Sequence, residues 1–306
     1  MERLLREKCA SVAAYDNLDG FYRGKENNLK KAESSERFKL IRADILDQDS
    51  LSKAIEDCQV VFHLAGQAGV RYCNENPLKA NQVNVHGTLN VLNCAKQHKV
   101  EKLVYASSSS IYGDPAYLPM DEKHPTNPNS PYGVSKLAAE QYCRVFSQVF
   151  DMDIASLRYF SVYGPRGRPD QVIYAFAQRI SERKQPVIFG DGNQTRDFTF
   201  VSDVVDATIL ASQKDKATGG EAFNIGHGSR ITINELVKKI INGMGLRDTI
   251  EPVYAEKSKG DFPDTEANNE KAKHVLGWNP KVNVTEGLKL FFDWFLYESE
   301  AGKLRA

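Results

Sequence analysis

The stretch Tyr105–Lys136, YASSSSIYGDPAYLPMDEKHPTNPNSPYGVSK, is the most informative part of the chain. It follows the apolar residues Leu103 and Val104, so the pattern predicts a strand that ends in serines, then a loop, then a helix. If that helix opens after Pro131, Tyr132 and Lys136 lie one turn apart on one face. A lysine ammonium beside a phenol stabilises the phenolate, and a serine hydroxyl can share a proton with it. The pattern therefore favours proton transfer at an alcohol oxygen while a hydride leaves the carbon that bears this oxygen. The alternative is that these residues simply begin an ordinary amphipathic helix.

Strands and helices alternate on both sides of this stretch. Apolar strands are predicted within SVAAYDNL, FKLIRADI, CQVVFHLAG, KLVYASSSS and DIASLRYFSVYGP, with helices between them. Strands that are almost uniformly apolar and alternate with helices are typical of a parallel sheet covered on both faces. The predicted fold is an α/β, Rossmann-like, doubly wound parallel sheet.

Polar and glycine residues gather where the predicted strands end. They are Asp16, Asp44, Gly66, Ser107 to Ser110, and Ser161. In open parallel sheets, ligands bind outside the carboxyl ends of the strands. The site is therefore expected at this edge of the sheet.

The sequence pattern changes after Pro165, where a basic, turn-rich segment is followed by predicted helices. The aromatic stretch LFFDWFLY near the C-terminus is expected to form a packed terminal helix. We predict a cofactor-binding domain over residues 1–164, to which 191–222 return. A smaller substrate-binding domain is predicted over 165–306.

Composition excludes several classes of function. Forty acidic residues balance forty basic ones among 306, so no net field attracts nucleic acid or an anionic membrane. The five cysteines are scattered and never in CxxC spacing, which predicts reduced thiols and no metal site. No apolar run approaches the roughly 20 residues of a membrane-spanning helix. The expectation is a cytoplasmic globular protein.

Many ordered motifs resemble the extended short-chain dehydrogenase/reductases, specifically the nucleotide-sugar epimerase/dehydratase family. They include HLAGQAGVRY, NVHGT, YASSSSIYGD, SPYGVSK, LRYFSVYGPRGRPD, VIFGDGNQTRDFTFVSDV, FNIG and LGWNP. The resemblance covers nearly the whole chain. It implies Tyr132 as acid/base, Lys136 as its support and Ser108 as the assisting hydroxyl.

The resemblance also implies NAD as the cofactor. Asp16 would bind the adenosine ribose, Asn17 would also contact the cofactor, Asp44 and Ile45 would bind the adenine, and the backbone of Leu64, Ala65 and Gly66 the rest of the cofactor. Asn84 would hold the site's geometry, and Tyr159 would flank the nicotinamide. The alternatives are a turn aspartate for Asp16, helix capping for Asp44, a structural amide for Asn84 and a core position for Tyr159.

A UDP-sugar is the substrate that the resemblance implies. Arg196 corresponds to the family's diphosphate clamp, Phe189 to the aromatic that stacks on uracil, and Asp261 to an acid near the nucleotide ribose. A core phenylalanine is the alternative for Phe189. The arginine expected three residues before Asp261 is Ser258 here. Ser161 and Arg168 favour a uronic acid.

One family feature is missing. Neither GxxGxxG nor GxGxxG, the turn that lets a pyrophosphate approach a helix N-terminus, occurs in the chain. The chain begins within the helix that should follow that turn, so we hypothesise a truncated gene model that lacks a central strand. Loss of that strand would expose two strand edges and weaken NAD binding.

The serine motif separates the possible reactions. Family members that eliminate water or carbon dioxide place an acid where this chain has Ser110. Reversible oxidation at C4, and hence 4-epimerisation of UDP-glucose or UDP-glucuronate, is therefore the expected reaction. The alternatives are a dehydratase, decarboxylase or reductase, and a non-catalytic binding protein. The helices within Pro77–Lys99 and after Tyr132 are expected to form a homodimer interface. A further alternative is that the chain acts only as a structural dimer partner, with these helices as its interface.

Overall fold

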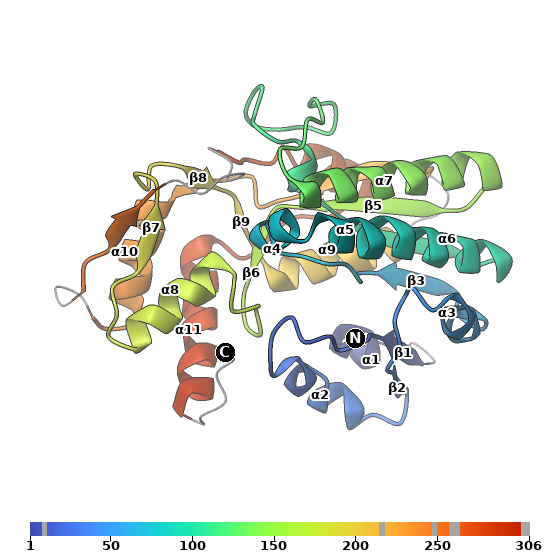
Figure 1. Ribbon diagram of the computed structural model, residues 1–306, viewed down its shortest axis with the longest axis horizontal. Coiled ribbons are helices and arrows are strands. Elements are labelled where there is room, and N and C mark those ends of the chain that lie inside the picture. Colours follow the sequence, from blue (N-terminus) through green and yellow to red (C-terminus); the bar gives the residue numbers. More distant parts are fainter. Residues whose placement is uncertain (8–10, 214–217, 247–249, 257–263, 301–306) are drawn as a thin grey trace. The chain divides into compact units, whose positions relative to one another are not determined.

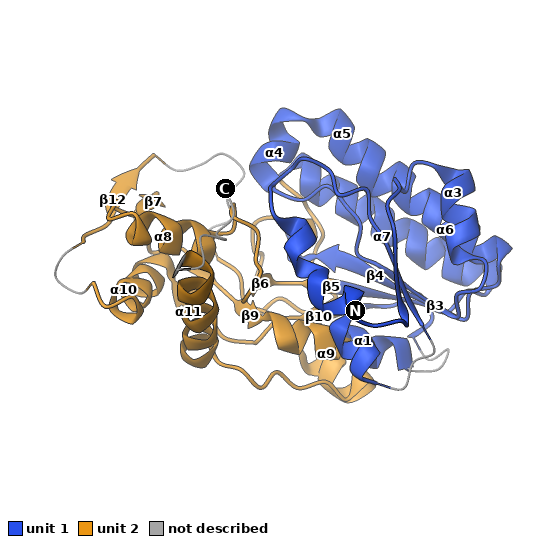
Figure 2. Cartoon of the chain, turned by 90° about the horizontal axis from the view of Figure 1, so that it is seen from below, with its two compact units in different colours: residues 1–110, 130–157, 208–222 blue, residues 111–129, 158–207, 223–306 orange. Residues whose placement is uncertain are grey.

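The computed structural model describes residues 1–7, 11–213, 218–246, 250–256 and 264–300. Their contacts divide the chain into two compact units, coloured separately in Figure 2. Unit 1 comprises residues 1–110, 130–157 and 208–222, and unit 2 comprises 111–129, 158–207 and 223–306. The domain boundaries expected from the sequence stay a prediction.

Two sets of strands form the α/β framework. Strand β1 (Val12–Tyr15) pairs in parallel with β2 (Phe38–Ile41). Strand β3 (Val60–His63) pairs in parallel with β4 (Lys102–Ser108), within a sheet of order β10-β5-β4-β3 whose other members are β5 (Ile154–Tyr159) and β10 (Ala222–Ile225). The predicted strands and their alternation with helices are confirmed.

Burial is uneven across these strands, which corrects one expectation. Every residue of β4 is buried, and all of β5 except Tyr159. In β1 and β2, by contrast, no residue is fully buried, and β3 buries only His63. Among the described residues, the β1-β2 ladder is not joined by hydrogen bonds to the four-stranded sheet. Strands at such open edges gain less cover than central ones, so uniform burial holds only for β4 and β5.

Helices cover the strands of unit 1 (Figure 1). They are α1 (Glu2–Arg6), η1 (Lys25–Asn28), α2 (Lys30–Glu33), α3 (Gln48–Ile55), α4 (Val70–Glu75), α5 (Pro77–Asn81), η2 (Gln82–His86), α6 (Gly87–Gln97) and α7 (Pro131–Phe150). The predicted long helix is α5, η2 and α6 in direct succession, and its middle turn, η2, is a π-helix. Helix α7 packs against β4, α4, α5 and α6. Neither α4 nor the π-helical turn was predicted from the sequence.

Amphipathic spacing explains the core of unit 1. Leu51 and Ile55, four residues apart on α3, are both buried. They belong to a cluster with apolar side chains of α6, β4 and α7, among them Leu92, Leu103 and Ala139. This packing fixes the two elements that carry the serine run and the Tyr132–Lys136 pair.

Unit 2 consists of short ladders and helices. Its strands are β6 (Ser161–Tyr163) with β9 (Phe198–Phe200), β7 (Val187–Phe189) with β12 (Val253–Ala255), and β8 (Thr195–Arg196) with β11 (Ile231–Thr232). Its helical elements are α8 (Val172–Ser181), α10 (Ile233–Gly243), η5 (Ala272–Leu276) and α11 (Val284–Glu300). The short η3 (Ser109–Ile111) and the helix α9 (Val201–Gln213) belong to both units. Phe291 and Phe295 of α11 are buried beside Tyr174 of α8, so the expected packed terminal helix is confirmed.

No helix within the described ranges is long and apolar enough to span a membrane.

The open β1-β2 ladder predicts unequal protection from hydrogen exchange. Amides of β4 lie between two strands under full cover, so we expect them to exchange only on global unfolding. Amides of β1 have one partner strand and little cover, so they should exchange much faster. Native-state exchange followed by mass spectrometry measures both. Equal protection would show that the two sets of strands open as one cooperative unit.

Candidate active site

Helix α7 begins where its sequence dictates. Ser130 is the N-cap, its hydroxyl accepting the Gly133 N–H at 3.2 Å, and Pro131 occupies the first turn. This start places Tyr132 in the first turn and Lys136 in the next. The Ser135 hydroxyl donates to the Tyr132 carbonyl at 2.8 Å. Tyr132 is half-buried, whereas Lys136 is only 6% exposed.

The Lys136 ammonium lies between two features of unit 1. Its Nζ is 4.7 Å from the centre of the Tyr105 ring on β4. A Cβ added to Gly66, in the loop after β3, would lie 3.6 Å from the same Nζ. Burial lowers the pKa of Lys136 to about 8. The ammonium is therefore still charged at neutral pH, although with a smaller margin than an exposed lysine has.

Asn84, on η2, connects the loop after β3 to α7. Its Oδ1 accepts the Gln67 N–H at 2.7 Å, and its Nδ2 donates to the Gln67 carbonyl at 3.0 Å and to the Ser135 hydroxyl at 2.9 Å. The amide is buried and all its bonds go to segments beside Lys136 and Gly66. The same hydrogen bonds make Asn84 a buried structural amide and hold the loop after β3 against α7.

Ser108 lies at the carboxyl end of β4, the strand against which α7 packs. It is buried, and its hydroxyl accepts the Ser110 N–H at 3.2 Å. His63, at the end of β3, is a buried histidine whose Nε2 lies 2.9 Å from the Thr88 hydroxyl. Burial and the Lys136 charge lower its pKa to about 3, so it stays neutral and is a core residue.

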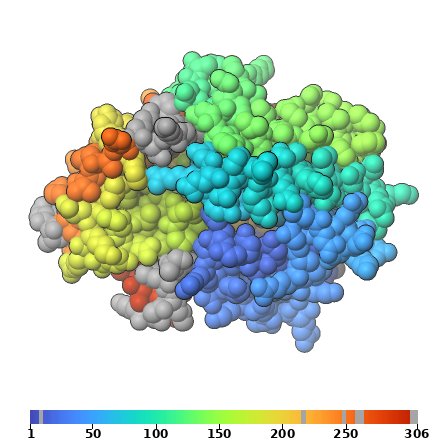
Figure 3. Space-filling model, viewed as in Figure 1, coloured from blue at the N-terminus to red at the C-terminus, as the bar shows by residue number. Residues whose placement is uncertain are grey.

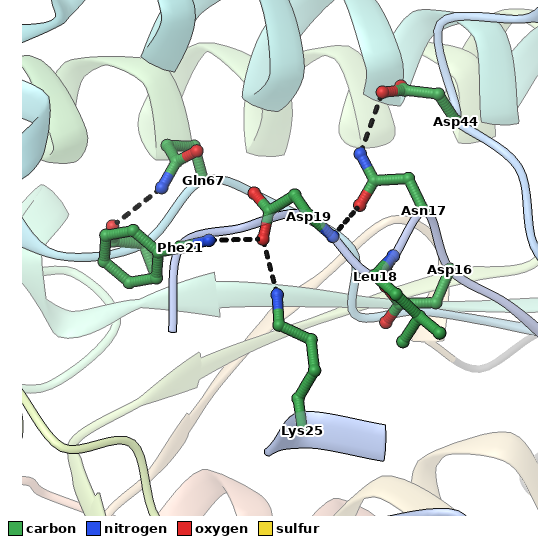
Figure 4. Close-up of polar contacts among 9 residues, drawn as sticks. Asp16, Asn17, Leu18, Asp19, Phe21, Lys25, Asp44 and Gln67 are labelled. Atoms are coloured by element: carbon green, nitrogen blue, oxygen red, sulfur yellow. Dashed lines mark hydrogen bonds and ion pairs between the residues drawn. The ribbon is translucent and has the colours of Figure 1, made fainter. Parts of the chain in front are cut away.

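A second group of predicted residues meets at the ends of β1 and β2 (Figure 4). The Asn17 amide donates to Asp44 Oδ2 at 2.9 Å, and Asp16 Oδ1 accepts the Leu18 N–H at 2.8 Å. The Asp44 Oδ1 accepts the Leu46 N–H, whereas the cap of α3 is Asp47. Helix capping by Asp44 is therefore wrong, because the Asp44 carboxylate bonds to a backbone N–H in the turn that precedes α3 and not to one in the helix.

Other predicted cofactor residues lie nearby in unit 1. Ile45 is buried against α6, where a Cβ on Gly87 would clash with its side chain. Leu64 is exposed, and Ala65 is half-buried. Beyond Asn17, Asp19 accepts the Phe21 N–H and forms an ion pair with Lys25 (Figure 4). These contacts give the loop after β1 a defined course.

The predicted substrate residues lie in unit 2, together with Tyr159. Tyr159 ends β5 and Ser161 begins β6; both are half-buried. Arg168 pairs with Asp170 through two nitrogens, at 2.9 and 3.1 Å. Phe189 ends β7 and is half-buried, and Arg196 of β8 donates to the Thr195 carbonyl. Asp261 lies outside the described residues.

Asp197, next to Arg196, was not singled out from the sequence. Its carboxylate is fully buried and accepts the N–H groups of His227 and Gly228, each at 2.9 Å, and of Ala267 at 3.0 Å. A Cβ on Gly226 would lie 3.0 Å from Oδ2, so that glycine leaves room for the carboxylate. One side chain thereby joins three segments of unit 2.

Glu140 was also missed. It lies four residues after Lys136, as Lys136 lies four after Tyr132, and that spacing was visible in the sequence. Its carboxylate is buried and accepts a hydrogen bond from Ser107. Within the described ranges, no group of three or more His, Cys, Asp or Glu side chains is arranged to hold a metal ion.

Loss of the Asn84 amide should weaken the fold. We expect Asn84→Ala to lower the free energy of unfolding by about 2 kcal/mol, because the buried Gln67 N–H and carbonyl lose their partner. Asn81→Ala, at an exposed position of α5, is the matched control and should change it by less than about 0.5 kcal/mol. Urea denaturation of both variants measures the difference. Equal stabilities would contradict the linking role of the amide.

Comparison with known proteins identifies the family. Residues 1–226 match the NAD dependent epimerase/dehydratase family. The UDP-glucose 4-epimerase of Mycolicibacterium smegmatis is 36% identical over 288 residues, covering 92% of this chain and 91% of that protein. The UDP-glucuronate 4-epimerase of Thermodesulfobacterium geofontis is 38% identical over 301 residues, covering 96% and 90%.

A solved structure extends the likeness to three dimensions. The UDP-glucuronic acid 4-epimerase of Bacillus cereus, in complex with UDP-glucuronic acid and NAD, superposes with a TM-score of 0.91 at 33% identity. The match covers 97% of this chain and 94% of that one. The chain belongs to the NAD dependent epimerase/dehydratase family.

Proposed function

We propose that this chain is an NAD-dependent 4-epimerase of a UDP-sugar, with UDP-glucose or UDP-glucuronate as the substrate. The observation that carries the proposal is the Tyr132–Lys136 pair on a capped helix, with Lys136 buried beside Gly66. Family membership and the 4-epimerases among its relatives support the reaction. Ser110, which is not an acid, favours simple oxidation and reduction over elimination.

Residues of unit 1 fit parts of NAD. Asp16 directly follows β1, a position where an acid can accept hydrogen bonds from ribose hydroxyls and disfavours a 2′-phosphate. Asn17, Asp44 and Ile45 lie beside it and would hold the adenine end. Gly66 leaves open space next to Lys136 that a side chain would reduce. Leu64, Ala65 and Tyr159 complete the proposed set, whereas no glycine-rich turn for the pyrophosphate occurs in the sequence.

The chain's own residues would move the proton. Bound NAD supplies the hydride acceptor and donor. Tyr132 would take the C4 hydroxyl proton and later return one, and Ser108 would hold the same oxygen by a hydrogen bond. The charged Lys136, one turn along α7, stabilises the phenolate that this transfer requires. Because the hydride is returned to the sugar in each cycle, no net oxidation of the substrate results.

Unit 2 would bind the nucleotide. Arg196 presents a guanidinium suited to a diphosphate, and Phe189 an aromatic face suited to uracil. Asp261 is proposed for the nucleotide ribose, and Ser161 and Arg168 for the sugar. The pairing of Arg168 with Asp170 means that this arginine would have to exchange partners to bind a sugar carboxylate.

Product analysis tests the proposed reaction. The chain is incubated with NAD and UDP-glucose, UDP-glucuronate or UDP-N-acetylglucosamine, and the sugars are resolved by NMR. We expect a C4 epimer of at least one substrate, and a loss of about 100-fold or more in rate for Tyr132→Phe, which cannot transfer the proton. Tyr297→Phe, on the exposed face of α11, should retain the full rate.

Two results would count against the reaction. Net formation of NADH would indicate a dehydrogenase. A dehydrated or decarboxylated sugar would instead indicate the elimination chemistry of other family members.

The exposed face of α7 supports a homodimer. Val134, Tyr142, Val145 and Val149 are exposed apolar residues whose spacing places them on one side of the helix. Leu78 of the neighbouring α5 is also exposed. Figure 3 shows α7 in green beside α4 to α6 in cyan on one surface of the molecule. An apolar face of this kind suits a second copy of the chain. A cytoplasmic location is part of the same proposal, and the free thiols of Cys58, Cys94 and Cys143 suit a reducing compartment.

A charge on this face should separate the dimer. We expect Val149→Asp to weaken dimerisation by about 30-fold or more, because a carboxylate would be buried without a partner. Leu290→Asp, an equivalent change at an exposed position of α11, should leave it unchanged. Sedimentation equilibrium measures both. A wild-type protein that stays monomeric at micromolar concentration would exclude this interface.

A further inference from the structure

Three consecutive turns of α7 carry ionisable side chains on one face. Tyr132, Lys136 and Glu140 are spaced by four residues, so each lies one turn beyond the last. Glu140 is only 3% exposed, and a buried carboxylate is unfavourable unless polar partners compensate it. The proposed function uses the first two residues and leaves the third without a role.

The bond made by Glu140 leads to the serine run. The Ser107 hydroxyl donates to Glu140 Oε2 at 2.5 Å, with both side chains buried. Ser107 precedes Ser108 in β4, so this bond holds the end of the strand that carries Ser108 against the helix that carries Tyr132 and Lys136. A hydroxyl–carboxylate bond of this kind is stronger than one between neutral groups.

The groups around Lys136 differ in the charge they bring. Burial raises the pKa of Cys143 on α7 and of Tyr105 on β4, and it lowers that of His63 on β3, so these three stay neutral near pH 7. Cys73 on α4 is a buried thiol that donates to the Gln67 carbonyl at 3.7 Å. Glu140 brings a carboxylate, whose negative charge opposes the effect of burial on Lys136.

We propose that Glu140 is a positioning residue of this site: it fixes the end of β4 on α7 through Ser107, and its carboxylate keeps the Lys136 ammonium charged. The inference deepens the proposed function and rests on it for the catalytic consequence. The electrostatic consequence for Lys136 is independent of the reaction. The two can therefore be tested separately.

The decisive measurement is the titration of Lys136 in the full chain. Lysine labelled with ¹³C at Cε gives an NMR signal for Lys136, assigned by its absence in Lys136→Met. We expect Glu140→Gln, which keeps the shape and removes the charge, to lower the Lys136 pKa by about one unit. Glu101→Gln, an equal charge change at an exposed position, should leave the titration where it is in the wild type.

The rate should follow the titration. Since the ammonium is the active form, the wild-type rate should fall as pH rises through about 8. In Glu140→Gln this fall should occur about one unit lower, giving a loss of about fivefold at pH 8 and little loss at pH 6. Ser107→Ala keeps the charge, so it should lower the rate without moving the pH at which the rate falls.

Distinct results separate the possible failures. An unchanged Lys136 titration in Glu140→Gln would overturn the inference whether or not the chain is an epimerase. A shifted titration with no epimerised product from the wild type would uphold the role of Glu140 and refute the proposed function. If Glu140→Gln does not fold, Glu140→Asp, which keeps the charge, replaces it: retention of the wild-type titration supports the inference, and a fall equal to that expected of the glutamine variant overturns it.

Discussion

The hydrogen bonds of the Asn84 amide set the geometry of the site in unit 1. Gln67, which it holds through both backbone groups, follows Gly66, and Ser135, to which it donates, precedes Lys136. One planar amide thus fixes the exposed glycine backbone and the lysine side chain relative to each other. A Cβ at Gly66 would lie 3.0 Å from Asn84 Oδ1, so a side chain there would crowd the amide. Asn84 lies in a π-helical turn, a local distortion that is frequent at functional sites.

Burial of Lys136 in this arrangement destabilises its charged form. Its pKa falls from 10.5 to about 8, which corresponds to about 3 kcal/mol against the charged form. Because the pKa in the folded state is the lower one, the penalty is complete below about pH 8 and disappears as pH rises towards 10.5. The fold carries this penalty at neutral pH. The stabilisation of a phenolate on Tyr132 is a function that would explain why the charge is kept there.

The sequence revealed the fold and the family because both rest on many weak patterns that agree. Strand and helix alternation needs only the apolar periodicity of each segment, and the ordered motifs run along nearly the whole chain. The Ser130 cap and the Pro131 start are local signals, so the position of Tyr132 and Lys136 on α7 followed from them. The family assignment is confirmed by the match over residues 1–226.

Features that depend on partners distant in sequence were not predictable in the same way. The alternation pattern cannot show that the described residues of the β1-β2 ladder lack hydrogen bonds to the four-stranded sheet, because pairing is a property of two strands. Asp44 looked as suitable for a helix cap as Asp47 does, and only the turn geometry separates them. Glu140 stood at a visible spacing, but its link to Ser107 spans 33 residues and needs the packed α7-β4 contact.

Asp197 is a buried charged residue of unit 2, as Lys136 is of unit 1, but its charge is negative. Burial raises its pKa to about 7, while the three backbone N–H groups that it accepts act in the other direction. A protonated carboxyl would point a hydrogen at donors that already fill both oxygens, so the geometry fits the ionised form. The negative charge then holds the segments of His227 and Ala267 against the strand end that carries Arg196 and Asp197, and Arg196 is the residue proposed to bind the diphosphate. The buried Asp197 carboxylate, next to a residue proposed to bind ligand, is held by fixed backbone N–H groups, which is an arrangement that preorganises a site before its ligand binds.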